Sequence, residues 1–208
     1  MTITGASLLT TLGKTLLDEN AEIWTSSIKV DFINEALLTV ALVRPDAVAT
    51  SVLLALVANT PRQSIPAGGY RLLNVLMNKA GVPIKKTTRE ALNDTVPSWT
   101  VAESDVIENF AFDEENPTEF WVQPVPESAL EILITYAAEP TVFVADASSI
   151  GISDVYIPAV KHFVLSKCYG MQTRGADYQK SSQHMTDFYK VLGLKFQSDT
   201  VLNAVQEE

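Results

Sequence analysis

The fold is decided in the stretch SIKVDFINEALLTVALVRPDAVATSVLLALVA, residues 27–58, where one pattern of apolar residues gives way to another. Up to residue 43 the apolar positions recur at spacings of three and four, which predicts a helix over 27–43. Pro45 ends this helix, because the residue before a proline is disfavoured in helical geometry. From residue 52 the period becomes two, which predicts a strand over 52–58. The chain thus changes from helix to sheet within this one stretch.

The same two patterns continue on either side of this stretch. Helical periodicity predicts further helices over 7–17, from about 156 onward and over 177–192, and Ser26 or Ser27 is the predicted cap of the helix over 27–43. Between them, alternating apolar residues predict strands over 62–66, 70–78, 106–112, 120–124 and 130–136. A short helix is predicted over 85–93, capped by Thr87 or Thr88. The simplest arrangement of the last three strands is an antiparallel meander.

These elements predict an α+β fold in which the N- and C-terminal helices form a bundle and an antiparallel β-hairpin or meander region is inserted between them. The predicted domains are a helical domain of residues 1–51 and 153–195 and a β-rich region of 52–152 with one short helix. Residues 196–208 form a predicted C-terminal tail.

Charge is distributed unevenly along the chain, whose formal net charge is −10. From Glu90 to Val160 there is no Lys or Arg, while fourteen Asp and Glu fall in that stretch. A surface with one sign of charge repels polyanions. The middle third of the chain is therefore not expected to bind nucleic acid.

Composition excludes several other classes of protein. The single Cys168 cannot form an internal disulfide and is expected to be a buried thiol, and with two His no zinc site of Cys/His type forms without carboxylates. No secretory signal is visible at the N-terminus, and the longest apolar run, residues 52–58, is too short to span a membrane. A reducing, aqueous compartment is expected.

Three groups of residues are candidate sites. His162 and His184 lie on predicted helices and are expected to be boundary residues. The loop carboxylates Asp113, Glu114 and Glu115 could bind a divalent cation in a metal-dependent hydrolase, although neighbouring loop carboxylates usually stay solvated. Lys85, Lys86 and Arg89 could contact phosphates in a DNA-binding module, but Trp24, Trp99 and Trp121 have no basic neighbours in the sequence to form a stacking groove. The residues alone predict no enzyme and no cofactor.

The order of several short motifs resembles a known family. These are Trp24, Leu42-Val-Arg44-Pro45-Asp46-Ala47, Pro66-Ala-Gly-Gly-Tyr70-Arg71-Leu72-Leu73, Pro97-Ser-Trp99, Phe110-Ala-Phe112-Asp113, Pro117, Phe120-Trp-Val122-Gln-Pro124 and Asp154-Val-Tyr156. In this order and spacing, from Trp24 to Leu192, the sequence is similar to bacteriophage head-to-tail adaptor proteins, also called connectors.

The resemblance implies a structural virion protein without catalytic residues. Such adaptors form a ring, commonly twelve-fold, beneath the portal protein, and the tail or nozzle protein assembles on it while genomic DNA passes through without sequence-specific binding. The implied location is the neck of the virion, after synthesis in the cytoplasm of the host bacterium and with no membrane contact. A stopper or a tail terminator, two other neck components, is the alternative.

Two sets of residues are candidates for this role. An acidic channel or rim would lack cations to hold phosphates, and its candidates are Glu103, Asp105, Glu108, Asp113, Glu114 and Glu115. These acids could equally serve to keep the β-hairpins soluble. The candidate portal-docking tail carries the apolar residues Phe196, Val201, Leu202 and Val205, although a frayed terminus is the alternative there.

Overall fold

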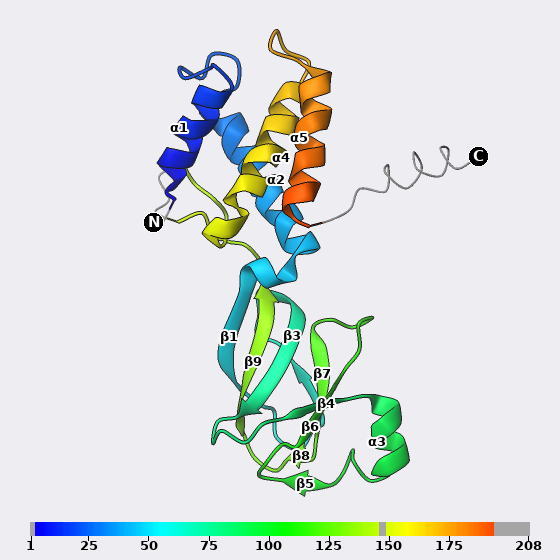
Figure 1. Ribbon diagram of the computed structural model, residues 1–208. Coiled ribbons are helices and arrows are strands. Elements are labelled where there is room, and N and C mark those ends of the chain that lie inside the picture. Colours follow the sequence, from blue (N-terminus) through cyan, green and yellow to red (C-terminus); the bar gives the residue numbers. More distant parts are fainter. Residues whose placement is uncertain (1–2, 146–148, 194–208) are drawn as a thin grey trace, which may run out of the picture. The chain divides into compact units, whose positions relative to one another are not determined.

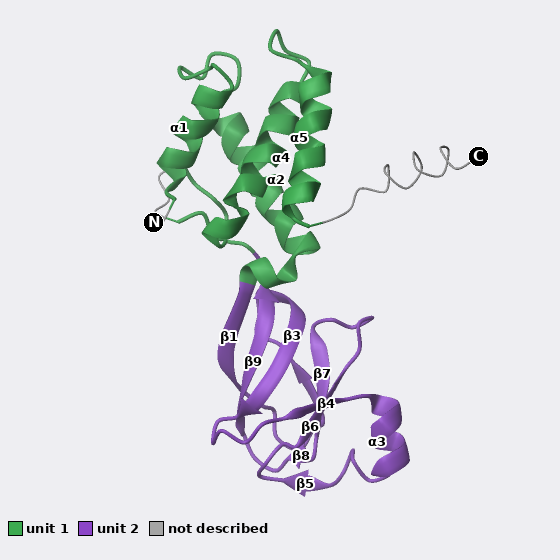
Figure 2. Ribbon diagram, in the orientation of Figure 1, with its two compact units in different colours: residues 1–48, 140–208 green, residues 49–139 purple. Residues whose placement is uncertain are grey.

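The computed structural model describes residues 3–145 and 149–193 and has the α+β fold that the sequence predicts (Figure 1). The chain divides into two compact units, unit 1 of residues 1–48 and 140–208 and unit 2 of residues 49–139 (Figure 2). The long described helices lie in unit 1 and the described sheets lie in unit 2. The division into domains at residues 51, 152 and 195 stays a prediction.

Unit 1 contains four α-helices and two short 3₁₀ helices within the described residues. They are α1 (Gly5–Thr15), α2 (Ser26–Val43), η1 (Pro45–Val48), η2 (Asp154–Tyr156), α4 (Ile157–Gly170) and α5 (Tyr178–Val191). The predicted cap of α2 was wrong: the side chain of Thr25 accepts a hydrogen bond from Ile28 N, while Ser26 is already the first helical residue. Pro158 lies in the first turn of α4, where its missing N–H leaves no helical bond unmade.

Helix α4 packs against both α2 and α5. The rings of Phe163 and Phe188 meet edge to face between α4 and α5, with centroids 5.3 Å apart. Most of α4 is buried, including Cys168 as predicted, and burial raises the pKa of its thiol to about 12. Of the described helices, none combines the length and the apolar character that crossing a membrane requires.

Unit 2 contains nine strands and one helix. The strands are β1 (Ala49–Ala55), β2 (Arg62–Ser64), β3 (Gly69–Asn78), β4 (Lys85–Thr87), β5 (Glu103–Ser104), β6 (Asn109–Phe112), β7 (Glu119–Gln123), β8 (Val125–Pro126) and β9 (Glu131–Ala138), and the helix is α3 (Arg89–Thr95). They form three sheets, with strand orders β1-β9-β3, β2-β7-β6-β4 and β5-β8. A core of buried apolar residues joins the first two sheets, with Ile132 and Ile134 from β9 beside Phe110, Phe120 and Val122 from β6 and β7.

The predicted antiparallel meander of the last three strands was wrong. β6 and β7 do form an antiparallel pair, but β9 lies in the other sheet, paired with β1 on one side and β3 on the other. The segment between β7 and β9 contains Pro124 and Pro126 and pairs as β8 with β5. The chain therefore leaves the sheet that contains β7 before β9 begins.

The short helix predicted over 85–93 was also partly wrong. Lys85–Thr87 is a strand, paired in parallel with β6, and the helix runs from Arg89 to Thr95. Thr88 caps the helix by accepting a hydrogen bond from Ala91 N at 3.2 Å. Thr87 is not the cap, because it is the last residue of β4 and the helix begins two residues later, at Arg89.

Candidate assembly surfaces

Two of the sequence motifs meet in a polar cluster in unit 1. The guanidinium of Arg44 donates to both carboxylate oxygens of Asp46, each at 2.9 Å, and the Tyr156 hydroxyl donates to Asp46 Oδ2 at 2.8 Å. Arg44 Nη1 also donates to the backbone oxygen of Leu192 at 3.1 Å, at the C-terminal end of α5. The cluster thus joins the end of α2, the start of α4 and the end of α5.

Acid should weaken this cluster. The hydrogen bonds from Arg44 outweigh burial and, with the bond from Tyr156, lower the pKa of Asp46 from 3.8 to about 2. A lowered folded-state pKa means that the stabilisation is fully present above about pH 4 and is lost as the pH falls through about 2. We expect Asp46→Asn to cost about 1 kcal/mol in free energy of unfolding at pH 6 and less as the pH falls from 4 to 2, measured by urea unfolding. In an Arg44→Met background this pH dependence should be much smaller, because only the hydrogen bond from Tyr156 remains; an undiminished dependence there would assign it to another group.

An uncharged apolar strip lies on the surface of unit 1. Leu38 and Leu42 on α2 are 59% and 76% exposed, and Val142 and Val144 in the segment that follows β9 are 80% and 51% exposed. Asn34 holds that segment against α2, since its side chain accepts from Phe143 N at 2.7 Å and donates to Phe143 O at 3.2 Å. We call Leu38, Leu42, Val142 and Val144 the apolar strip.

A pocket overlaps the apolar strip at Leu38 and Val142. The pocket is lined by Asn34, Leu37, Leu38, Pro140, Thr141 and Val142. No lining residue carries a charge, although the whole chain has a net charge of −10. An exposed apolar area of this kind, free of charge, is typical of a protein–protein contact.

The six acids predicted to form a channel or rim lie in two groups. Glu103, Asp105 and Glu108 precede β6, whereas Asp113, Glu114 and Glu115 follow it in the loop to β7. Asp113 is half-buried and accepts a hydrogen bond from Glu115 N at 3.1 Å, while the other five are exposed. Because the two groups lie at opposite ends of β6, they do not form one continuous cluster.

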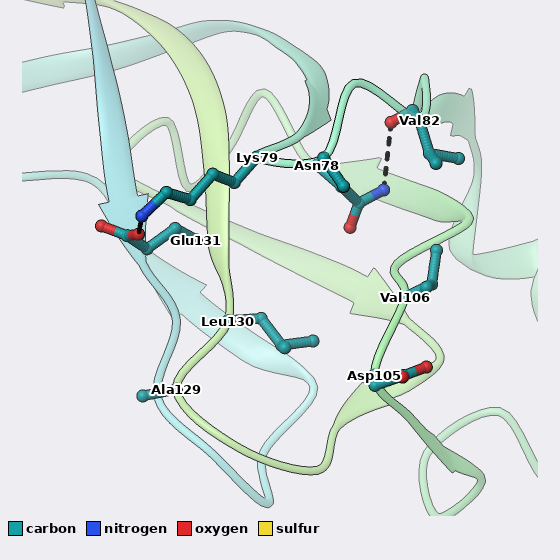
Figure 3. Close-up of a pocket in the computed structure, with 9 residues that line it drawn as sticks. Asn78, Lys79, Val82, Asp105, Val106, Ala129, Leu130 and Glu131 are labelled. Carbon is teal, nitrogen blue, oxygen red and sulfur yellow. Dashed lines mark hydrogen bonds and ion pairs between the residues drawn. The ribbon is translucent and has the colours of Figure 1, made fainter.

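Basic residues from outside the acidic stretch neutralise part of it. Arg62 pairs with Glu119 and Lys79 with Glu131, and Arg71 lies 3.7 Å from Glu114. The Lys79–Glu131 pair lines the same pocket as Asp105 (Figure 3). In the folded unit, basic side chains from other parts of the sequence therefore lie beside some of these acids, so acidic and basic residues are less segregated than they are along the sequence.

The sequence indicated that the three tryptophans have no basic neighbours, and the structure corrects this for one of them. Lys85 and Lys86 lie on β4 and are exposed, but the Arg89 guanidinium lies 4.5 Å from the centroid of the Trp121 ring. Trp121 therefore does have a basic neighbour. Trp121 packs against the small core of Leu92, Trp99 and Ala111, and a tryptophan held in this way is not a free platform for bases.

A cluster that the sequence interpretation missed lies between α4 and α5. His162 Nδ1 and His184 Nδ1 are 3.1 Å apart, and ligand atoms of His162, His184 and Asp187 all lie within 4.8 Å of one another. Burial, followed by the proximity of His162, lowers the pKa of His184 below its usual value. No other group of three potential metal-ligating side chains occurs in the described residues, so Asp113, Glu114 and Glu115 do not form one.

The candidate tail residues Phe196, Val201, Leu202 and Val205 lie outside the described residues. Of the described acids, bases and histidines weighed from the sequence, the structure brings together only the two histidines. One feature of the sequence indicates this cluster: His184 and Asp187 are three residues apart, which places both on the same face of a helix.

Comparison with known protein families gives one match. The model of the family described as SU10 adaptor protein matches residues 3–206 of the chain's 208. A comparison with curated proteins returned no match. The family match covers both units, including the Arg44–Asp46–Tyr156 cluster and the apolar strip.

Proposed function

Because the chain belongs to the SU10 adaptor protein family, whose members are bacteriophage adaptors, we propose that it forms a ring beneath the portal in the virion neck. The observation that carries this proposal is the family match over residues 3–206. The tail or nozzle protein assembles on the ring, which is twelve-fold, and the genome passes through it. The role is structural, without catalysis or cofactor; a stopper or tail terminator of the same neck is the alternative.

The apolar strip is the proposed contact between neighbouring subunits of this ring. Subunits in a ring meet through two different faces, and each copy of this chain carries the same net charge of −10. Two such copies repel each other least where they meet through uncharged surface, because their charges then stay farther apart. Burying Leu38, Leu42, Val142 and Val144 against a second copy removes apolar area from water without bringing like charges together.

The acidic residues and the tail have separate proposed roles. Of the acids, Glu103, Asp105, Glu108 and Glu115 are exposed and form no ion pair within the described residues. We assign them to the DNA path, where they would not hold phosphates. We assign Phe196, Val201, Leu202 and Val205 to the contact with the portal. Asp113 and Glu114, in the loop after β6, are assigned to the same DNA path, as a group separate from the acids before β6.

Electron microscopy of the chain mixed with purified portal protein tests the proposal. We expect a ring of this protein stacked on the portal, with the acids facing the central channel or its rim.

A variant lacking residues 196–208 should keep the circular dichroism spectrum of the full chain but fail to bind the portal. Wild-type binding by that variant would contradict the assignment of the tail, and acids that all face outward would contradict the DNA-path assignment. A ring found at another layer of the virion would favour the stopper or tail terminator.

A further inference from the structure

We propose that His162, His184 and Asp187 form a binding site for a divalent transition-metal ion of the zinc type, which links α4 to α5. The site lies wholly within unit 1 and does not depend on the proposed ring function. Its three side chains come from two helices that pack against each other. All three are half-buried, so an ion there would be reached from solvent and could keep water as a further ligand.

The separation of the two imidazole nitrogens fits coordination of one ion. Zinc binds imidazole nitrogen at about 2.0–2.1 Å, and two such ligands at the tetrahedral angle are about 3.3 Å apart. The two Nδ1 atoms are 3.1 Å apart, close to that separation. His184 and Asp187, three residues apart on α5, present their ligand atoms on one face of the helix, as in helical metal sites built on i, i+3 pairs. The third ligand, His162, comes from the facing helix α4.

Neighbouring contacts hold these side chains in place. The Tyr169 ring stacks on His184, with an interplanar angle of 7° and centroids 5.8 Å apart. Gln183 Nε2 donates to Asp187 Oδ1 at 3.1 Å, which leaves the other carboxylate oxygen for a metal ion. One turn away, the Ser181 hydroxyl donates to Ser166 O at 2.8 Å and ties α5 to α4. Metal ligands positioned on packed helices and oriented by a second set of contacts lose little freedom when the ion binds.

The donor set selects the class of ion. Two neutral imidazoles and one carboxylate suit zinc and its neighbours in the transition series, whereas magnesium and calcium prefer sites made of oxygen ligands. To bind one ion through both Nδ1 atoms, each ring keeps its single proton on Nε2, so no net proton release is needed from a neutral pair. Without an ion, one Nδ1–H donates to the other Nδ1, which explains the same distance by a hydrogen bond alone. The experiment has to separate these two states.

Zinc titration of the full chain, first treated with a chelator, makes that separation. The chain has two His in total, so histidine side-chain nitrogen resonances report on this site alone. We expect one equivalent of ZnCl₂ to shift the signals of both rings and, at a hundred-fold excess over the Kd, to raise Tm by about 5–10 °C. MgCl₂ at the same concentration should do neither. Unmoved histidine signals at saturating micromolar zinc would overturn the proposal in favour of a plain hydrogen bond.

Variants identify the ligands. His162→Gln and His184→Gln should each weaken zinc binding by a hundred-fold or more in calorimetric titration, and Asp187→Asn by ten-fold or more. Asp113→Asn is the matched control, because it removes a carboxylate from the loop that is the other acidic candidate, and it should leave the affinity unchanged. Zinc binding that survives in both histidine variants, or that is lost with Asp113→Asn, would overturn the assignment. Melting curves recorded without metal show whether a variant is folded before its affinity is interpreted.

Discussion

Replacing Leu42 and Val142 together by aspartate is expected to abolish ring assembly on the portal while leaving the chain folded. These side chains are 76% and 80% exposed, so their replacement removes little from the core. In a subunit contact, by contrast, each loses about 1.5–3 kcal/mol of apolar burial, and a carboxylate without a partner adds a further penalty. The loss is repeated at every contact of the ring. Electron microscopy and co-sedimentation with portal protein measure the result.

Leu17 offers the matched control for this pair of substitutions. It is 92% exposed, lies in the turn after α1 and is outside the apolar strip. Its backbone has a positive φ of 54°, a conformation that aspartate tolerates better than leucine, so Leu17→Asp should not lower stability. We expect Leu17→Asp to assemble normally. Normal assembly of the Leu42→Asp, Val142→Asp variant would exclude the strip as the subunit contact.

Local patterns in the sequence predicted most of the elements but not how the strands pair. The bounds of α2 and α5 agree with the period of 3.6 to within one residue, because a cap and a helix-ending residue mark each of them. Strand pairing depends on contacts far apart in the chain: β9 pairs with β1, more than seventy residues earlier. Periodicity shows which face of β9 is buried, and it carries no information about which strands lie beside it.

The candidate sites show the same limit. Along the chain, the acids between Glu90 and Val160 have no basic neighbour, yet Arg62, Arg71 and Lys79 reach Glu119, Glu114 and Glu131 in the folded unit. The histidine cluster was missed for a related reason. His162 and His184 are twenty-two residues apart, on helices whose antiparallel packing alone brings them together.

Two sequence motifs of the family resemblance, by contrast, gain a physical explanation. Arg44 and Asp46 follow α2, and Tyr156 precedes α4, more than one hundred residues later. Their hydrogen bonds join the segment where the chain leaves unit 1 for unit 2 to the segment that begins α4. A lysine at position 44 could not donate to both carboxylate oxygens and to Leu192 O with one planar group.

Trp24 is the single residue whose truncation is expected to destabilise unit 1 most. It is 2% exposed, its indole Nε1 donates to Cys168 O at 2.9 Å, and its ring meets Tyr169 edge-on at 6.0 Å. A Cβ on Gly175 would lie 2.4 Å from the ring, so the chain there is built around the indole. The Asp18 carboxylate also accepts a hydrogen bond from Trp24 N at 2.9 Å. The indole therefore connects the segment before α2 with the end of α4.

Truncation to Trp24→Ala leaves a cavity of indole size and should cost about 3–5 kcal/mol in free energy of unfolding, measured by urea unfolding followed by circular dichroism. Trp24→Phe keeps much of the packing but removes the N–H, so Cys168 O loses its donor, at a cost of about 1–3 kcal/mol. Trp121→Ala, at a half-buried position in unit 2, is the control and should cost less than Trp24→Ala. Because the indole spans the start of α2 and the end of α4, Trp24→Ala should also speed hydrogen exchange in α4. A cost below 1 kcal/mol with unchanged exchange would mean that these contacts do not hold unit 1 together.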